Sequence, residues 1–184
     1  MPDTLKMGLK LLLITAIATF ALALTQMITE EPIRVQAEKA NDEARAAVLE
    51  GAEEFRSLEI SERTYPNILE AHEGLVNGNT IGYTFKTTNS GYGGQIVVIV
   101  GIDSEGVISG VRIAQHAETP GLGAKAQESS FYQQYSGKSG SSNLSNDDIQ
   151  AITGATVSSN AVTGAVNHAI DYYLAELVTG GDNQ

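Results

Sequence analysis

Two short segments of this 184-residue chain combine glycines and hydroxyl side chains in a way that can bind a phosphate. The first reads His116-Ala117-Glu118-Thr119-Pro120-Gly121-Leu122-Gly123, and the second reads Thr153-Gly154-Ala155-Thr156-Val157-Ser158-Ser159. The second opens a stretch with apolar residues at helical spacing, and a helix start offers unpaired N–H groups to an anion. The alternative interpretation is that Thr153 or Thr156 only caps this helix, as such residues usually do.

Other familiar motifs fail on their spacing. Gly137-Lys138-Ser139 lacks the glycine that a P-loop needs five positions earlier, where Tyr132 stands. The Gly121-x-Gly123-x-x-Ala126 pattern is not followed by the apolar-periodic helix of a dinucleotide-binding fold. The three histidines show no metal-ligand spacing, and no G-x-S-x-G elbow of a serine hydrolase occurs. We therefore expect no metal site and no hydrolytic nucleophile.

The composition excludes several further functions. The chain has no Cys, which rules out disulfides, thiolate metal sites, cysteine-ligated iron–sulfur clusters and a cysteine nucleophile. Its 11 Lys+Arg and 22 Asp+Glu give a formal net charge of -11, which argues against nucleic-acid binding. Hydrophobic residues make up 42% and charged residues only 18%, so the chain can form a core.

Residues 11–29 carry no ionisable side chain and are long enough to form a transmembrane helix that contacts the lipid bilayer. Lys6 and Lys10 precede them and acidic residues follow, so we expect residues 1–10 in the cytoplasm and the rest outside. The alternative is a cleaved signal peptide, with Ala21-Leu22-Ala23 as its A-x-A site. No turn-forming residue precedes that triplet, and apolar residues continue past it. We therefore favour an uncleaved single-pass anchor.

We predict a helical connector over residues 30–70. Residues 32–60 are rich in Ala, Glu and Arg with apolar residues at helical spacing, which predicts one or two amphipathic helices. Pro32 suits the first turn of such a helix.

Residues 71–184 are predicted to form one extracytoplasmic domain. Runs rich in β-branched residues predict strands at 80–86, 95–103 and 107–115, and the last two should pair as an antiparallel hairpin. Helices are predicted near 129–135 and over 153–177, the second closed by Gly180-Gly181. The expected fold class is α+β, with a single N-terminal transmembrane helix followed by a small antiparallel sheet packed by helices.

The two segments, in this order and about 30 residues apart, resemble the FMN-binding domain family. That family includes the G subunit of the Rnf electron-transport complex and the C subunit of the sodium-translocating NADH:quinone oxidoreductase. The resemblance covers roughly residues 75–177. The single anchor also matches, and the length favours the G subunit.

The resemblance implies covalently bound FMN. In the family, the last threonine of an [S/T]-G-A-T motif carries FMN through a phosphoester bond, and Thr156 is the matching residue. The H-x-E-T-P-G-L-G loop lies against the isoalloxazine ring. The implied cofactor-binding residues are Thr156, Thr153, Gly154, Ala155, Ser158, Glu118, Thr119, Pro120, Gly121, Leu122 and Gly123. One departure is Gln150, because the family often has Asp three residues before the first hydroxyl residue.

The implied function is electron transfer within an Rnf-type ion-translocating ferredoxin:NAD oxidoreductase complex, with no autonomous catalysis. The implied partners are the other membrane subunits and a separate flavin transferase that uses FAD and a divalent metal. The implied location is the cytoplasmic membrane of a prokaryote. Glu118 and the net charge are expected to lower the flavin's reduction potential. The alternative is a non-redox, anchored extracytoplasmic binding or assembly module in which Thr156 is only a cap.

Overall fold

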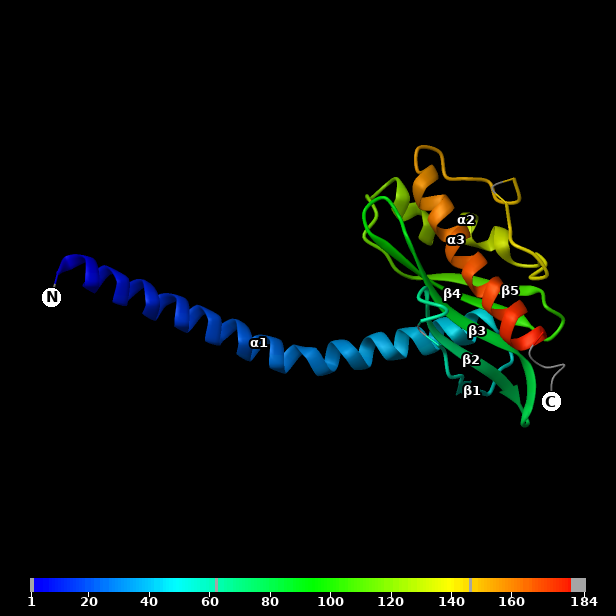
Figure 1. Cartoon of the computed structure of the whole chain (residues 1–184), viewed down its shortest axis with the longest axis horizontal. Helices are drawn as coiled ribbons and strands as arrows, with labels where there is room; N and C mark the ends of the chain where they lie inside the picture. The colour runs from blue at the N-terminus through cyan, green and yellow to red at the C-terminus, as the bar shows by residue number, and fades with distance from the viewer. Residues whose placement is uncertain (1, 62, 146, 180–184) are drawn as a thin grey trace. The chain divides into compact units, whose positions relative to one another are not determined.

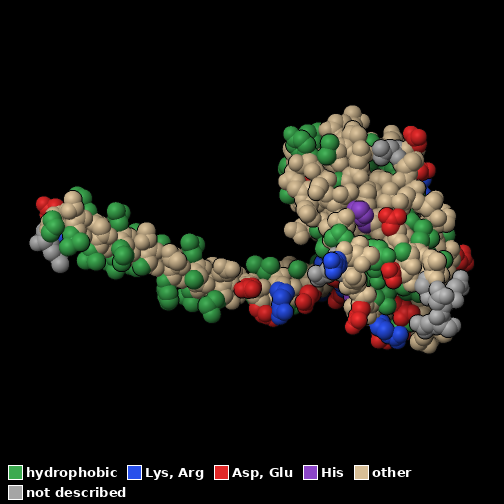
Figure 2. Space-filling view, in the orientation of Figure 1, with side chains coloured by type: hydrophobic (Ala, Val, Ile, Leu, Met, Phe, Trp, Pro, Cys, Tyr) green, Lys and Arg blue, Asp and Glu red, His purple; other side chains and the backbone are tan. Residues whose placement is uncertain are grey.

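The computed structural model describes residues 2–61, 63–145 and 147–179, which fall into two compact units, Met1–Asn41 and Asp42–Gln184. Helix α1 (Asp3–Val48) supplies the first unit and the beginning of the second (Figure 1). Among the described residues, α1 is the one helix long and apolar enough to cross a membrane, as judged by length and composition. Its large apolar side chains, such as Phe20 and Met27, are exposed. Figure 2 shows these hydrophobic side chains along most of the N-terminal part of α1.

The predicted helices between residues 32 and 60 are wrong in two respects. Pro32 lies inside α1 rather than in the first turn of a new helix. The helix also ends at Val48, three residues before Gly51, which has a φ of 92°. That left-handed conformation costs glycine little and stops a helix. Residues 54–57, expected to be helical, form a strand instead.

Five strands form one antiparallel sheet in the order β1-β2-β3-β4-β5. They are β1 (Glu54–Ser57), β2 (Ile68–Val76), β3 (Asn79–Ser90), β4 (Gln95–Asp103) and β5 (Ile108–Gln115). The predicted β4–β5 hairpin is confirmed, with Val100 opposite Val111. Neither β1 nor β2 was predicted. The β2–β3 turn is Asn77-Gly78, with φ of 51° and 79°, and Asn-Gly is the strongest short hairpin signal.

Helix α3 (Thr156–Tyr172) packs against one face of the sheet, which we call the inner face (Figure 1). Large apolar side chains of β3 to β5 fill the inner face, namely Phe85, Ile96, Val98, Val100, Ile102 and Val111. Their partners on α3 are Val162, Val166 and Ile170. Short helices η1 (Gly123–Gln127), α2 (Ser129–Tyr132) and η2 (Gln133–Tyr135) confirm the helix predicted near 129–135. After α3, a π-helical turn η3 runs from Tyr173 to Val178, and Gly180-Gly181 lies outside the described residues.

The opposite, outer face of the sheet receives the end of α1. Four glycines face it in a row across β2 to β5, where Gly74 is opposite Gly82 and Gly101 is opposite Gly110. A Cβ on Gly101 would lie 2.3 Å from the carbonyl oxygen of Val48, and one on Gly74 would lie 2.4 Å from Leu49 Cδ2. Val48 and Leu49 are buried there. The predicted α+β fold class is therefore confirmed, with more strands than the sequence indicated.

Candidate functional site

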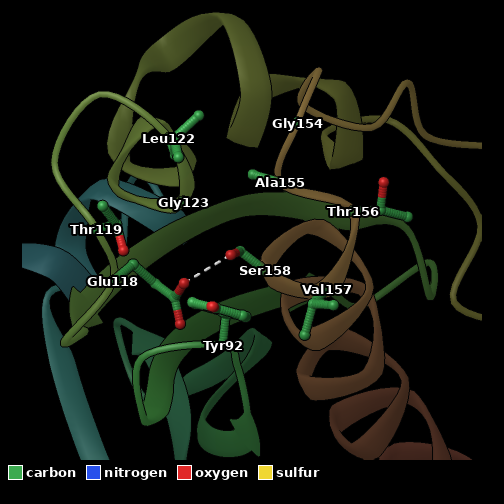
Figure 3. A pocket seen from close by; sticks show the side chains of 10 residues that line it. All are labelled: Tyr92, Glu118, Thr119, Leu122, Gly123, Gly154, Ala155, Thr156, Val157 and Ser158. Atoms are coloured by element: carbon green, nitrogen blue, oxygen red, sulfur yellow. Dashed lines mark hydrogen bonds between the residues drawn. The ribbon is translucent and has the colours of Figure 1, made fainter.

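A pocket of ≈ 630 Å³ opens where the β3–β4 hairpin tip, the loop after β5 and the start of α3 meet (Figure 3). This volume falls within the roughly 300–1,000 Å³ typical of small-molecule sites. Its lining consists of Tyr92, Glu118, Thr119, Leu122, Gly123, Gly154, Ala155, Thr156, Val157 and Ser158. The fold therefore brings the two segments singled out in the sequence to opposite sides of one pocket.

Most of the cofactor-binding residues implied by the resemblance line this pocket, but three do not. Thr153, Pro120 and Gly121 are exposed and lie outside its lining. Two lining residues were missed. Val157 lies inside the second segment, and Tyr92 lies in the glycine-rich link between two strands, where the sequence pattern indicated only a turn.

The start of α3 leaves backbone donors unused. Ala155 is the N-cap residue and no side chain caps the helix, so the alternative in which Thr153 or Thr156 serves as a cap is wrong. Ser159 instead closes the preceding turn, because its Oγ accepts from the Ile152 N–H at 2.9 Å and donates to the Ala155 carbonyl at 3.0 Å.

No acceptor among the described residues reaches the N–H groups of Thr156, Val157 or Ser158. Thr156 is the first helical residue, is exposed and lines the pocket. Gly154 has a φ of 78°, and a Cβ there would approach only Leu122, at 3.5 Å. Three free donors beside an open glycine fit a phosphate, which helix starts bind through such groups and the helix dipole.

Glu118 joins the three walls of the pocket. Its side chain is 5% exposed, and Oε2 accepts a hydrogen bond from Ser158 Oγ at 2.6 Å (Figure 3). Its Oε1 accepts from the backbone N–H of Gly93 at 3.0 Å, on the β3–β4 hairpin tip. Ser158 is one of the implied cofactor-binding residues, and in the structure its hydroxyl donates to Glu118.

Two glycines lie directly beside the Glu118 carboxylate, where the walls of the pocket leave little room for a side chain. A Cβ on Gly123 would lie 2.4 Å from both Glu118 Oε2 and Ser158 Oγ. A Cβ on Gly91 would lie 2.2 Å from Glu118 Oε1. A larger residue at either position would force the Glu118 carboxylate or the Ser158 hydroxyl to move from its present hydrogen-bonded place.

Hydrogen bonds to η2 hold the segment that leads into α3. The Gln150 N–H donates to Gln134 Oε1 at 2.8 Å, and Gln134 Nε2 donates to the Gln150 carbonyl at 3.2 Å. Two hydrogen bonds from Ser145 lower the pKa of Asp148 in the adjoining loop. These contacts fix the approach of the chain to Thr156 through backbone atoms.

Further along α3, Tyr135 fixes the helix position. Burial raises the pKa of Tyr135 to about 12, and its hydroxyl lies 2.8 Å from Thr163 Oγ1 of α3. This buried contact links η2 to α3. A phenol with this raised pKa is neutral at physiological pH.

Comparisons with known proteins agree with this geometry. A family described as the FMN-binding domain matches residues 91–171, which contain every lining residue of the pocket. The chain is 39% identical to the G subunit of the Na(+)-translocating ferredoxin:NAD(+) oxidoreductase complex of Acetobacterium woodii, over 91% of this chain and 90% of that protein. It is 30% identical to the G subunit of the ion-translocating oxidoreductase complex of Methanosarcina acetivorans, over 93% and 95% of the two chains.

The comparison with solved structures supports the fold. It is the C subunit of the Na(+)-translocating NADH-quinone reductase from Parabacteroides distasonis, with a TM-score of 0.56. The match covers 76% of this chain and 94% of that one at 15% sequence identity. At this identity the likeness concerns the fold alone.

Proposed function

Because this chain belongs to the FMN-binding family of G subunits of ion-translocating oxidoreductase complexes, we propose that it carries FMN covalently and passes electrons within such a complex. The observation that carries the proposal is the pocket at the start of α3, where three backbone N–H groups lack acceptors among the described residues. That donor set suits the phosphate of FMN, and the pocket is large enough for a small molecule.

The point of attachment is the hydroxyl of Thr156. Two threonines lie near the helix start and both are exposed, but only Thr156 lines the pocket. It is the first helical residue, so its own N–H is one of the free donors of the first turn. Thr153 lies within the turn from Ile152 to Ala155 and outside the pocket lining.

Each wall of the pocket has its own task. The free N–H groups of α3 hold the phosphate, while Leu122 and Val157 offer apolar surface to the ring system. Bound FMN supplies the redox chemistry, and the chain supplies position and electrostatics. No described Lys or Arg forms an ion pair with the buried Glu118, so its charge opposes added negative charge nearby and lowers the reduction potential.

Residues 11–29 anchor the protein in the cytoplasmic membrane of a prokaryote, with the N-terminus inside and the FMN domain on the extracytoplasmic face. The charge pattern supports this orientation, because Lys6 and Lys10 precede the span and Glu30 and Glu31 follow it. Electrons enter and leave through other membrane subunits of an Rnf-type ferredoxin:NAD oxidoreductase. A flavin transferase moves the FMN group of FAD onto the Thr156 hydroxyl, so that the phosphoester bond forms as the pyrophosphate bond of FAD breaks and AMP leaves.

The test is the intact mass of the full chain, purified from cells that contain the transferase, together with in-gel ultraviolet fluorescence. The wild type should carry the mass of one FMN. Thr156→Ala should lose it, Thr156→Ser should recover part of it through the remaining hydroxyl, and Thr153→Ala should keep it. An unmodified wild-type mass would overturn covalent flavin and favour a non-redox module, while loss of flavin only in Thr153→Ala would move the attachment site.

A further inference from the structure

The pocket mouth holds most of the exposed large apolar side chains of the globular unit. Beyond α1, five such residues are exposed among those described, namely Leu69, Tyr92, Leu122, Val157 and Val178. Tyr92, Leu122 and Val157 all line the same pocket. Single exposed apolar residues need no explanation, but a group around one cavity marks a surface that a ligand or partner covers.

Tyr92 is the most exposed of the five, at 76%. Figure 3 shows its ring beside Glu118 and Val157, across the pocket from Leu122. A tyrosine that sits at a pocket mouth with its ring this exposed gains little from the fold itself. Its exposed aromatic surface is available to pack against a planar ligand in the pocket.

The backbone around Tyr92 is nevertheless fixed firmly. The Gly91 N–H donates to the Gly94 carbonyl at 2.7 Å, which closes the tip, and the Gly93 N–H donates to Glu118 at 3.0 Å. A Cβ on Gly93 would lie 2.2 Å from the Ala117 carbonyl oxygen, so the tip packs directly on the loop after β5. An exposed side chain on an anchored backbone is typical of a residue that is held ready for a ligand.

We infer that Tyr92 is a ring-contacting residue of the site, with its phenol packed against the isoalloxazine of the bound flavin. The inference rests on the proposed function and adds to it a contact between the flavin ring and the hairpin tip, which is the third wall of the pocket. Glu118 accepts hydrogen bonds from Gly93 on the hairpin tip and from Ser158 on α3. These two bonds hold the hairpin tip and the start of α3 in fixed positions relative to each other. Flavin rings are planar and aromatic, and offset stacking on tyrosine suits them.

The readout is the fluorescence of the attached flavin. A phenol in van der Waals contact gives one electron to the excited flavin and takes it back without emission. Contact with Tyr92 should therefore quench the flavin fluorescence. Tyr92→Phe keeps the ring but removes the easily oxidised phenol, and Tyr92→Leu removes both. Tyr132→Leu is the matched control, because Tyr132 packs against Arg112 and does not line the pocket.

The experiment uses the full chain purified with its flavin, and flavin content is measured by intact mass. Emission per attached flavin should rise several-fold in Tyr92→Phe and in Tyr92→Leu, and should not change in Tyr132→Leu. Unchanged emission in both Tyr92 variants, with normal flavin mass, would overturn the contact while leaving the proposed function intact. Absence of flavin from the wild type would overturn both.

A second measurement covers the case in which a Tyr92 variant attaches little flavin. In the Thr156→Ala background, which has no attachment point, titration with free FMN reports binding alone. Adding Tyr92→Leu should weaken this binding several-fold relative to Thr156→Ala alone, and adding Tyr132→Leu should not. Equal FMN affinity in the Tyr92 and Tyr132 double variants would overturn the inference.

Discussion

The two faces of the sheet achieve close packing in opposite ways. On the inner face, large apolar side chains from β3, β4 and α3 interdigitate, and Phe85 and Val100 are fully buried. On the outer face, a row of glycines removes side chains altogether, so that the backbone of Val48 rests on the strands. The inner face holds α3, whose first residues line the pocket, and the outer face holds the end of α1.

This difference determines which kind of substitution each face tolerates. A filled core loses stability when atoms are removed, because a cavity remains. A surface shaped by glycines loses stability when atoms are added, because the neighbouring backbone cannot move aside cheaply. Large-to-small substitutions should therefore be most damaging on the inner face under α3. Substitutions of glycine by larger residues should be most damaging on the outer face under the end of α1.

The largest expected effect is that of Phe85→Ala on the inner face. Phe85 is completely buried and packs near Tyr83 and Tyr172. Its truncation should lower the free energy of unfolding by about 3–5 kcal/mol. Denaturant unfolding of the full chain in detergent measures this, with Phe85→Leu as a control that should lose less. A loss below about 1 kcal/mol would mean that the inner face is not close-packed.

On the outer face, Gly101→Ala should destabilise the protein by about 1–3 kcal/mol, although it adds one methyl group. The new Cβ would meet the Val48 carbonyl oxygen at 2.3 Å, and that oxygen also accepts a hydrogen bond from Ser109 Oγ at 2.5 Å. Gly110→Ala is the graded control, because its Cβ would meet Val48 Cα at 3.1 Å. Equal stability losses at both glycines would contradict the importance of the carbonyl contact.

These two substitutions also show what could be predicted from sequence. The inner face follows from the β-branched run of Gln95–Asp103, which predicted β4 and its hairpin with β5. The outer face could not be predicted, because a Cβ on Gly74, Gly101 or Gly110 would first meet Val48 or Leu49, which are distant in sequence. A Cβ on Gly82 would first meet the Ile102 carbonyl oxygen of the neighbouring strand. Local patterns show that a glycine is present but not what packs against it.

Strand β2 and the third wall of the pocket were missed for different reasons. The Asn77-Gly78 turn was a recognisable hairpin signal between β2 and β3, so that omission was avoidable. Tyr92, by contrast, lies in a glycine-rich link whose partner is the buried carboxylate of Glu118. The motifs predicted two of the three pocket walls, which are the loop after β5 and the start of α3. Only the fold shows that the β3–β4 hairpin tip lies against them.

The smallest expected effect concerns the charges at the edge of the outer face. Glu70 accepts from Lys86 Nζ at 2.7 Å and pairs with Arg45 near the end of α1. Burial alone would raise the pKa of Glu70, but the hydrogen bonds and charges of Lys86 and Arg45 outweigh it and lower the pKa below its ordinary value. The carboxylate therefore stabilises the fold above its unfolded pKa, and this contribution is lost as the pH falls through the folded pKa.

Glu70→Gln tests whether charge or shape holds α1 on the sheet. Since the side chain of Glu70 is 33% exposed, solvent screens the pairs, and the variant should lose only about 0.5–1 kcal/mol at neutral pH. The difference from wild type in denaturant unfolding should shrink as the pH falls below the ordinary glutamate pKa of about 4.3 and through the lowered pKa of the folded protein, because the wild-type carboxylate becomes protonated. Glu105→Gln, in the β4–β5 turn, should show no such trend. If Glu70→Gln instead cost more than Gly101→Ala at neutral pH, charge rather than the glycine row would hold the end of α1.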